Sequence, residues 1–378
     1  DHLIHNEINS GNAVDVILFD ISKAFDTVHH RLINKLTNSF GITGKLISWI
    51  KAFLTDRTQS VKISNNLFSQ ASPVLSGVIQ GSILGPILYA AYTNDIVRCF
   101  SYGKPVLYAD DLKVVFPINV SDINNSYALI MRDLNNLSIW SQATGLQFNF
   151  NKCIVLHYGA NNPNFVHTVC GQTLPSANSA VDLGVIRSTN LRYDEHCNNL
   201  IRRANSTCAF ILRTFASRNV SFMSRIFIAY VRPILEYACQ VWSPYTIDLI
   251  NRVERVQRLF TKRIRCISHL TYNERLARLG LQRLESRRLY YDLLYLYKLK
   301  FNYLHMSLVN FNIQVSRLNN SRFISLPSSS CIYFNYFTVR SIRLWNSLSS
   351  SVTFASNLFR FKRLLSHVNF VPYLRGRA

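Results

Sequence analysis

The chain has 378 residues, and its 48% hydrophobic and 12% aromatic content allows a substantial core and excludes a largely disordered protein. Its net charge of +22 is uneven, because residues 1–190 contain 13 basic and 12 acidic side chains whereas residues 191–378 contain 29 and 8. A strongly basic half indicates a polyanionic partner, most simply nucleic acid, with a membrane surface as the weaker alternative.

The spacing of the cysteines and the hydropathy of the chain indicate in which cellular compartment the protein is expected. The eight cysteines form no C-x-x-C pair and no zinc-like array, so they are predicted to be buried, reduced thiols of an intracellular protein. No uncharged apolar run reaches the ~20 residues of a membrane span. The chain begins at Asp1 rather than at Met, and we expect it to be a piece of a longer polypeptide.

The first predicted strand covers residues 14–20, an apolar run that ends in an acid. Such a run is typical of a strand buried on both faces of a sheet. It places the Asp20 carboxylate at the C-terminal end of the strand, where the side chain can reach a site. Asp15 is interpreted as a solvated residue at the start of the strand.

Three elements are predicted next. Residues 29–40 and 45–54 form helices, because their apolar residues recur with the helical period. Residues 60–68 form a strand and turn with Asn65-Asn66 at the tip. Residues 77–98 begin with glycines and continue as a buried helix from Pro86.

Gln80 and Gly81 lie in the glycine-rich part of this last segment. They indicate either a loop that leads into a helix or a backbone that approaches a flat ligand closely, because glycine has no side chain to block it. The residues themselves leave both interpretations open.

Residues 106–115 carry two adjacent aspartates, Asp110 and Asp111, between short runs of β-forming apolar residues. The runs predict paired strands, and Asp is favoured in the turn between them. Such a hairpin would place two carboxylates at the end of a sheet, and a cation would stabilise them because the two anions repel. An ordinary acidic turn is the alternative.

Further elements complete the first half. Residues 123–143 predict an amphipathic helix, and residues 146–156 predict a strand with Lys152 in its middle. Residues 181–185 predict a short strand broken by Gly184.

The basic half is predicted to consist of arginine-rich helices. In residues 248–265 the apolar side chains form one stripe, and the basic side chains lie largely off it. Repeated arginine pairs with few acids nearby favour a surface that binds a nucleic-acid backbone over an ordinary solvated surface. Residues 316–330 are polar and predict a linker or extended loop.

Three acids together point to one chemistry. Asp20 at a strand end and Asp110 and Asp111 in a neighbouring hairpin could hold two divalent ions about 3.5–4 Å apart, as in-line displacement at phosphorus requires. Mg²⁺ prefers such hard oxygen ligands. With a basic surface, this set predicts phosphoryl or nucleotidyl transfer on a nucleic acid.

Five segments in order resemble the motifs of a known family. FDISKAFDTV, SGVIQGSILGPILYAAYTNDI and LYADD resemble motifs A, B and C of reverse transcriptases, and GLQFNFNKC and DLGV resemble motifs D and E. The likeness is greatest to non-LTR retrotransposon polymerases of the jockey type, and it continues through RPILEYACQVWSPY, RVERVQRLFTKRI and VRSIRLWNSLSSSV. The resemblance implies an RNA-directed DNA polymerase that uses two Mg²⁺ ions, or Mn²⁺ in their place, with an RNA template, a DNA primer and dNTPs.

The resemblance also implies roles for individual residues. Asp20, Asp110 and Asp111 would bind metal, and Lys152 would donate a proton to the departing pyrophosphate, with an ordinary surface lysine as the alternative. Lys23 and Asp26 would orient the corner after the first strand. The other implied contacts are Phe25 as the steric gate beneath the sugar, Gln80 and Gly81 at the incoming nucleotide, and Leu183 and Gly184 in the primer grip.

The resulting fold class is α+β: a right-hand polymerase palm, with an antiparallel sheet and helices on one face, partial fingers, a mostly helical thumb and a C-terminal region. The predicted parts are a palm with partial fingers (1–158), a primer-grip region (159–189), a basic thumb (190–300) and a C-terminal extension (301–378). We expect an intracellular protein of nuclear and cytoplasmic ribonucleoprotein, with no membrane partner.

Two departures from the family pattern support a different function. Ile79 stands where family members usually carry Pro before the Gln-Gly of motif B, which would leave nucleotide positioning looser. The fingers motifs expected upstream of motif A, and an endonuclease domain, are missing from the sequence. The alternative is therefore a catalytically inactive, retroelement-derived fragment that binds nucleic acid.

An RNA-copying RNA polymerase is a further alternative, because Asp15 and Asp20 have the Asp-x4-Asp spacing of that class. We favour the reverse transcriptase, since the intervening strand would separate Asp15 from the site and Phe25 would lack a role.

Overall fold

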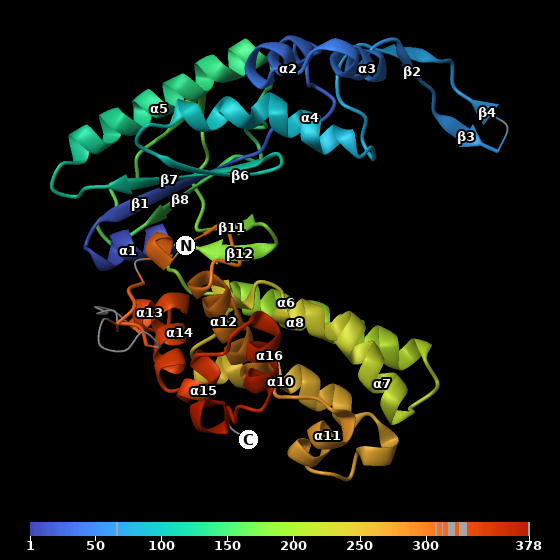
Figure 1. Cartoon of the computed structure of the whole chain (residues 1–378), viewed down its shortest axis with the longest axis vertical. Helices are drawn as coiled ribbons and strands as arrows, with labels where there is room; N and C mark the ends of the chain where they lie inside the picture. The colour runs from blue at the N-terminus through green and yellow to red at the C-terminus, as the bar shows by residue number, and fades with distance from the viewer. Residues whose placement is uncertain (66, 307, 312, 317–321, 325–330, 377–378) are drawn as a thin grey trace. The chain divides into compact units, whose positions relative to one another are not determined.

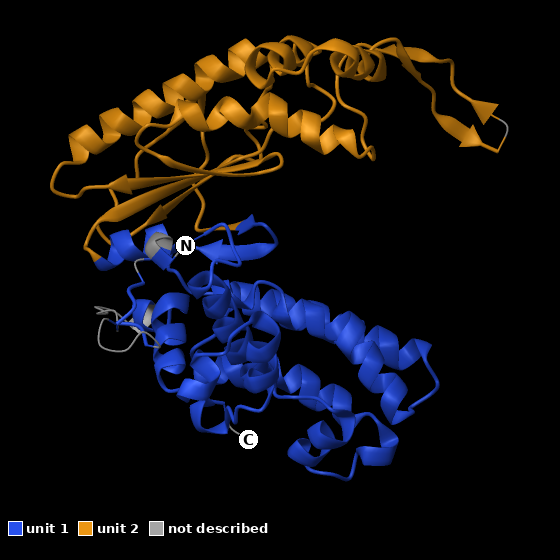
Figure 2. Ribbon diagram, viewed as in Figure 1, with its two compact units in different colours: residues 1–9, 181–378 blue, residues 10–180 orange. Residues whose placement is uncertain are grey.

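The structure, a computed structural model, describes residues 1–378 apart from 66, 307, 312, 317–321, 325–330 and 377–378. The chain divides into two units, residues 10–180 and residues 1–9 with 181–378 (Figures 1 and 2). The first unit combines a sheet with helices and the second is mostly helical, which confirms the predicted α+β class. Most of the polar segment predicted over residues 316–330 lies outside the described residues.

A four-stranded antiparallel sheet forms the centre of residues 10–180, in the order β6-β7-β1-β8. Six of the seven residues of the inner strand β1 are buried, so the predicted burial on both faces is confirmed. The strands are β1 (Ala13–Phe19), β6 (Lys104–Tyr108), β7 (Asp111–Ile118) and β8 (Ile154–Tyr158).

The predicted hairpin is formed by β6 and β7. Tyr108 pairs with Asp111, which leaves Ala109 and Asp110 as a two-residue turn. Ala109 has a φ of +54°, as the first central residue of a tight hairpin turn can require.

The pairing of β1 with β7 determines where the acids lie. Phe19 is opposite Leu112 in this antiparallel register. Asp20 follows Phe19 directly, and Asp110 and Asp111 directly precede Leu112. All three acids are therefore at the same end of the sheet, although 90 residues of chain separate the first two.

Helices cover one face of this sheet, where α4 and α5 run across it in Figure 1. α5 ends at Gly145, which has the left-handed conformation of a helix C-cap. α4 begins two residues before the predicted Pro86, and Ile87 on it is 60% exposed, so the prediction of a wholly buried helix is wrong. The helices of this unit are α2 (Leu32–Phe40), α3 (Gly44–Leu54), α4 (Leu84–Thr93), η1 (Asn94–Cys99) and α5 (Ile123–Thr144).

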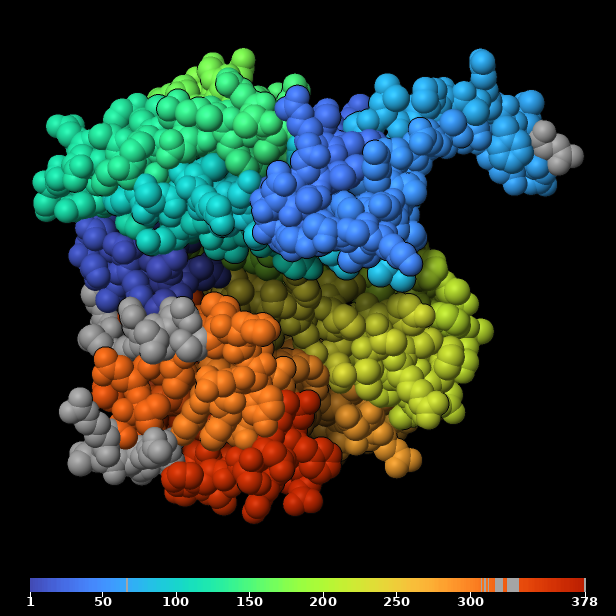
Figure 3. Space-filling view, turned by 45° about the horizontal axis from the view of Figure 1, so that its top comes forward, coloured from blue at the N-terminus to red at the C-terminus, as the bar shows by residue number. Residues whose placement is uncertain are grey.

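Four short strands project from the rest of this unit as an arm, seen clearly in Figure 3. β2 (Arg57–Gln59) pairs with β5 (Ser72–Val74), and β3 (Lys62–Ser64) pairs with β4 (Leu67–Phe68). The strand and turn predicted over residues 60–68 corresponds to the β3–β4 ladder, although residue 66 of its tip lies outside the described residues.

Two strand predictions need correction. Residues 146–153 do not continue into β8, because the backbone turns after Asn149, where the N–H groups of Lys152 and Cys153 donate to the Asn149 carbonyl at 2.9 and 3.0 Å. The predicted strand over 181–185 is instead a hairpin of β11 (Ser179–Asp182) and β12 (Val185–Ser188). Leu183 and Gly184 form its turn, and both have positive φ. Residues 10–180 also contain a two-stranded sheet of β9 (Thr168–Val169) and β10 (Gln172–Thr173).

Residues 181–378 with 1–9 pack around two apolar cores. α10 confirms the predicted apolar stripe, since Val253, Val256 and Phe260 are buried. A π-helical turn precedes Pro233, whose ring cannot fit an ordinary helical turn. The elements are α1 (His2–Asn9), α6 (Asp194–Thr214), α7 (Val220–Ile226), η2 (Phe227–Val231), α8 (Arg232–Glu236), α9 (Cys239–Trp242), α10 (Ile247–Lys262), η3 (Arg265–Ile267), α11 (Tyr272–Leu279), α12 (Leu284–Lys300), η4 (Leu308–Phe311), α13 (Cys331–Phe334), α14 (Phe337–Asn346), α15 (Ser350–Thr353), α16 (Leu358–Ser366) and η5 (Val371–Tyr373).

Cysteine burial and hydropathy can be compared with the sequence predictions. Seven described cysteines are free thiols and five of them are buried, but Cys266 is exposed, so the prediction of burial is wrong there. Burial raises the pKa of the Cys197 thiol to about 12. Within the described part of the chain, no helix combines the length and the hydropathy that a membrane span requires.

The prediction that Asp15 is solvated is wrong, because its side chain is fully buried. The carboxylate accepts hydrogen bonds from His157 at 2.7 Å, His167 at 2.6 Å and Asn162 at 2.9 Å. Burial raises the pKa of Asp15, but these hydrogen bonds outweigh it and leave the pKa below its ordinary value. Both carboxylate oxygens of Asp15 are thus bonded inside the fold, five residues upstream of Asp20.

We predict that Asp15→Asn lowers the free energy of unfolding at pH 7 by about 3 kcal/mol, because His157 and the buried His167 lose their anionic partner. Since the folded pKa is depressed, this contribution is fully present above the unfolded pKa of about 3.9 and is lost as pH falls through the folded value. Urea unfolding at pH 7 and at pH 3 measures the difference. The exposed helix cap Asp122→Asn is the control, and equal losses in the two variants would refute the role of Asp15.

Candidate functional site

A cavity of about 470 Å³ brings together five of the predicted site residues. They come from the end of β1, the loop before α4, the β6–β7 turn and the turn before β8. The ten lining residues are Asp20, Ile21, Ser22, Lys23, Ala24, Phe25, Gln80, Asp110, Asn149 and Lys152.

Two carboxylates share this cavity. Asp20 and Asp110 are half-buried, so their oxygens can be reached from solvent while the apolar sheet lies behind them. Asp111 opens β7 and is exposed, outside the lining. Among the described residues, no group of three or more His, Cys, Asp or Glu side chains has an arrangement that could hold a metal ion.

Lys152 lies beside the first of these acids. Its Nζ is 3.5 Å from Oδ2 of Asp20. The turn that carries Lys152 is held in place because its N–H donates to the Asn149 carbonyl at 2.9 Å, and Asn149 is itself bonded to the Asp20 backbone. The lysine side chain is 66% exposed, so this ion pair adds little stability. Lys152 thus places a positive charge next to the Asp20 carboxylate.

The Phe25 ring packs against the Tyr89 ring of α4. The two rings stack with centroids 4.8 Å apart and planes inclined by 20°. Tyr89 is 1% exposed, and its hydroxyl has no hydrogen-bond partner among the described residues. Burial and the nearby charges of Asp110 and Asp111 raise the pKa of Tyr89, so the acids lie within electrostatic reach of this hydroxyl.

The loop before α4 is bonded to the corner after β1. Val78 N–H donates to the Phe25 carbonyl at 2.8 Å, and the Gln80 side chain donates to the Asp26 carboxylate at 2.8 Å. This bond agrees with the predicted role of Asp26 in orienting the corner. Gly81 has a φ of +79° and does not line the cavity.

Gly77 allows the closest approach of these two segments. A Cβ at Gly77, whose φ is +87°, would be 2.8 Å from the Asp26 carbonyl oxygen. Arg57 holds the same loop, donating from Nη2 to the Gly77 carbonyl at 2.8 Å and from Nε to the Leu54 carbonyl at 2.9 Å.

Sequence reasoning missed three parts of this site. Tyr89 lies in the helix predicted from Pro86, and a tyrosine hydroxyl within that mostly apolar run is the available signal. Gly77 and Asn149 act through the backbone; glycine is itself a signal of close approach at Gly77, whereas the residue type of Asn149 does not indicate its contact. Leu183 and Gly184 belong to the other unit and do not line the cavity.

An antiparallel sheet with helices on one face, and with a strand-end acid and a hairpin acid in one cavity, is the architecture of a polymerase palm. Residues 4–211 match the family described as reverse transcriptase (RNA-dependent DNA polymerase). Because this match spans more than half of the chain, the protein belongs to the reverse transcriptase family.

Curated relatives are retrotransposon proteins, which confirms the resemblance to the jockey type. The probable RNA-directed DNA polymerase from transposon X-element of Drosophila melanogaster is 26% identical over 253 residues, 64% of this chain and 27% of that protein. The RNA-directed DNA polymerase from mobile element jockey of Drosophila melanogaster is 25% identical over 271 residues, 68% of this chain and 29% of that protein. The chain thus spans less than a third of these relatives.

Solved structures of telomerase also match. Telomerase from Candida tropicalis in complex with a fragment of telomeric RNA has 13% identity and a TM-score of 0.40, covering 97% of this chain and 51% of that one.

We predict that Gly77→Ala destabilises the fold by about 1–3 kcal/mol more than Gly81→Ala, because the new methyl group meets backbone that cannot move aside. Gly81 is the matched control, since its φ is also positive but an added Cβ would meet nothing within 4 Å. Urea unfolding of the two variants gives the comparison. Equal losses of unfolding free energy in the two variants would show that the close backbone approach at Gly77 does not disfavour an added methyl group.

Proposed function

We propose that the protein is an RNA-directed DNA polymerase that adds dNTPs to a primer 3′-hydroxyl on an RNA template during retrotransposition. The observation that carries the proposal is the shared cavity of Asp20, Asp110, Phe25 and Lys152 in a chain of the reverse transcriptase family. RNA template, DNA primer and dNTPs are the proposed partners, in nuclear and cytoplasmic ribonucleoprotein.

Reverse transcriptases generally use divalent metal ions, and the donor set here suits Mg²⁺, with Mn²⁺ as a substitute. Asp20 and Asp110 offer hard oxygen ligands at one cavity, and Asp111 is the proposed third ligand. When bound, two such ions activate the attacking hydroxyl and stabilise the leaving oxygen. The carboxylates of Asp20 and Asp110 would hold the ions through oxygens that can be reached from solvent.

Lys152 is the proposed proton donor to the departing pyrophosphate. Its Nζ lies within the cavity lining and beside Asp20, and a flexible exposed lysine can follow a leaving group that moves outward. The alternative, an ordinary surface lysine, predicts no effect of its removal on the chemical step.

Phe25, Gln80 and Gly81 are proposed to receive the incoming nucleotide. The stacked Phe25 ring would lie beneath the sugar and exclude a 2′-hydroxyl, because Tyr89 prevents it from retreating. Gln80, which the Asp26 carboxylate orients, would contact the nucleotide together with the backbone at Gly81.

Residues 181–378 are proposed to hold the nucleic acid. Leu183 and Gly184 form the turn of a hairpin, anchored where Tyr237 Oη donates to the Leu183 carbonyl at 3.0 Å, and this turn is the proposed primer grip. We propose the same division into palm with partial fingers, primer-grip region, thumb and C-terminal extension that the motifs imply.

A catalytically inactive fragment that binds nucleic acid is the second candidate. The charge of residues 191–378, with 29 basic and 8 acidic side chains, favours backbone binding whether or not the palm is active.

Primer extension on an RNA template with dNTPs and Mg²⁺ separates the two functions. We expect extension by the wild type and a loss of at least ~100-fold in rate for Asp110→Asn, because a metal ligand is worth several kcal/mol in the transition state. Asp122→Asn, which removes an exposed charge outside the cavity, should retain activity. Binding without any extension would support the inactive fragment, and full activity of Asp110→Asn would refute the metal site.

We predict that Phe25→Val raises ribonucleotide incorporation by about 10–100-fold, because the smaller side chain leaves room for the 2′-hydroxyl. Tyr89→Leu should produce a smaller change in the same direction, whereas Tyr89→Phe keeps the ring and should leave selectivity unchanged. The measurement is the ratio of kcat/KM for dNTP and rNTP. Unchanged selectivity in Phe25→Val would remove its role as gate.

A further inference from the structure

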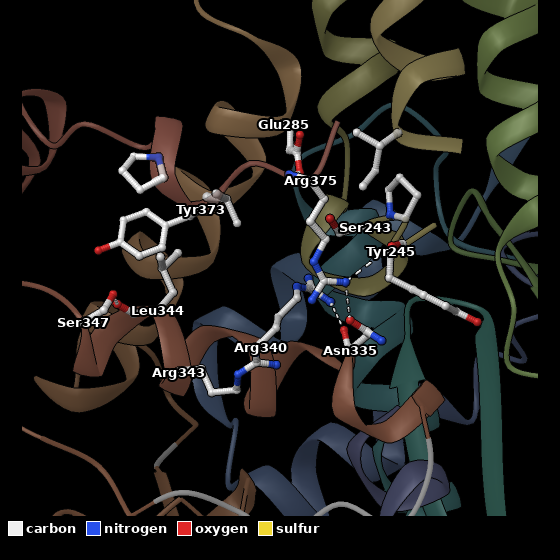
Figure 4. A pocket seen from close by; sticks show the side chains of 14 residues that line it. Ser243, Tyr245, Glu285, Asn335, Arg340, Arg343, Leu344, Ser347, Tyr373 and Arg375 are labelled. Carbon is white, nitrogen blue, oxygen red and sulfur yellow. Dashed lines mark hydrogen bonds between the residues drawn. The ribbon is translucent and has the colours of Figure 1, made fainter. Parts of the chain in front are cut away.

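A second cavity, of about 410 Å³, lies within the mostly helical unit (Figure 4). α10, α12 and α14 contribute to its walls, together with the loop that carries Tyr245 and the segment that carries Tyr373 and Arg375. None of its lining residues belongs to the palm cavity, and the proposed polymerase chemistry gives it no role.

The cavity lining combines buried residues with exposed arginines. Pro244, Ile250 and Leu344 are buried apolar residues, Glu285 and Asn335 are buried polar ones, and Arg343 and Arg375 are exposed. Such a division lets one ligand bury an apolar part while a charged part stays near water.

The charges of the cavity are only partly balanced. Arg340 is paired with Asp292, Nε to Oδ2 at 2.8 Å, so its charge is neutralised. The Glu285 carboxylate accepts the backbone N–H groups of Arg375 and Gly376 at 2.8 and 3.0 Å. It anchors the segment that carries Arg375 rather than pairing with a guanidinium.

Two arginines remain without an acidic partner. Within the described part of the chain, no carboxylate lies within 4.0 Å of the guanidinium groups of Arg343 and Arg375. Burial and the charge of Arg375 lower the pKa of Arg343, so the two cations repel each other. An anion between them would relieve this repulsion and could accept hydrogen bonds from both guanidinium groups.

Both guanidinium groups are already positioned. Arg343 lies over the Phe334 ring, 3.9 Å from its centroid. Arg375 donates to Oδ1 of Asn335 at 2.8 Å, and Arg340 donates to the Asn335 carbonyl at 3.0 Å. Figure 4 shows Arg340 and Arg375 converging beside Asn335. Prior ordering of these side chains reduces the entropy lost on binding.

We propose that this cavity binds one nucleotide of a single-stranded nucleic acid, at a site separate from the polymerase cavity. The phosphate lies between Arg343 and Arg375, and the base packs against the apolar side chains of the lining next to Tyr245 or Tyr373. Aromatic rings beside arginines bind unpaired bases of any sequence. The volume suits one nucleotide but not a duplex.

A single-stranded nucleic acid is favoured over a free nucleotide as the ligand. The same unit carries further cations that have no acidic partner among the described residues. A third cavity, of about 470 Å³, is lined by Leu212, Arg213, Arg218, Lys262, Arg263, Arg265 and Ser268 and has no acidic lining residue. A polymer gains contacts with such cations beyond one cavity, and a mononucleotide does not.

The test measures binding of fluorescein-labelled U15 RNA to the full chain by anisotropy, with excess unlabelled primer–template duplex present to occupy the palm. We expect Arg343→Gln to weaken binding about tenfold, as loss of a charge-assisted phosphate contact would. Arg360→Gln, an exposed arginine of α16 outside the cavity, is the matched control and should weaken binding less than about threefold. Equal effects of the two substitutions would overturn the proposal.

A second measurement locates the bound RNA on the protein and tests whether a free nucleotide or phosphate can replace it. U15 containing 4-thiouridine should crosslink to peptides with Tyr245 or Tyr373 in the wild type, and Arg343→Gln should lose these crosslinks. Crosslinks confined to other segments would overturn the proposal, as would equal competition by uridine monophosphate or inorganic phosphate at the same phosphate concentration. Neither measurement needs catalysis, so a chain that fails to extend primers would refute the polymerase and leave this site standing.

Discussion

The register between β1 and β7 is the constraint on which the rest of the structure depends. With Phe19 opposite Leu112, Asp20 lies at the end of the sheet where the β6–β7 turn carries Asp110. A slip of one residue would turn every side chain of β1 to the opposite face. Such a slip would move the buried Asp15 carboxylate away from its hydrogen-bond partners His157, His167 and Asn162, so the register is fixed. The packing of β1 in the interior, not attraction between acids, therefore brings two repelling carboxylates together.

The remaining segments of the site are bonded to the corner after β1, mostly through backbone hydrogen bonds. The loop at Val78 bonds to the Phe25 carbonyl, and the turn at Asn149 bonds to the Asp20 carbonyl. These bonds do not depend on side-chain identity at either end. Gln80 and Lys152 can therefore be held near the acids while their own side chains remain exposed.

Local patterns were predictable from sequence, and long-range contacts were not. The β6–β7 hairpin and α5 follow from alternation, helical period and turn residues within one short segment. The burial of Asp15 depends on His157 and His167, which lie 142 and 152 residues further along the chain, so nothing local indicated it. The stacking of Tyr89 on Phe25 likewise joins segments 64 residues apart. The basic residues of the second half were predicted as a surface, but not the cavities into which some of them are folded.

The uneven charge of the chain is consistent with a division of labour that electrostatics would favour. If the chain is the polymerase proposed above, a nearly neutral palm would hold cations at its acids and still release pyrophosphate, because few fixed positive charges would retain that anion. A strongly basic helical unit gains from many weak phosphate contacts, each of which exchanges for a counterion. Concentrating such contacts around the palm would strengthen product binding as much as substrate binding. Under the proposed function, placing them in residues 191–378 would let the protein hold a polymer firmly while the site in the other unit releases small anions.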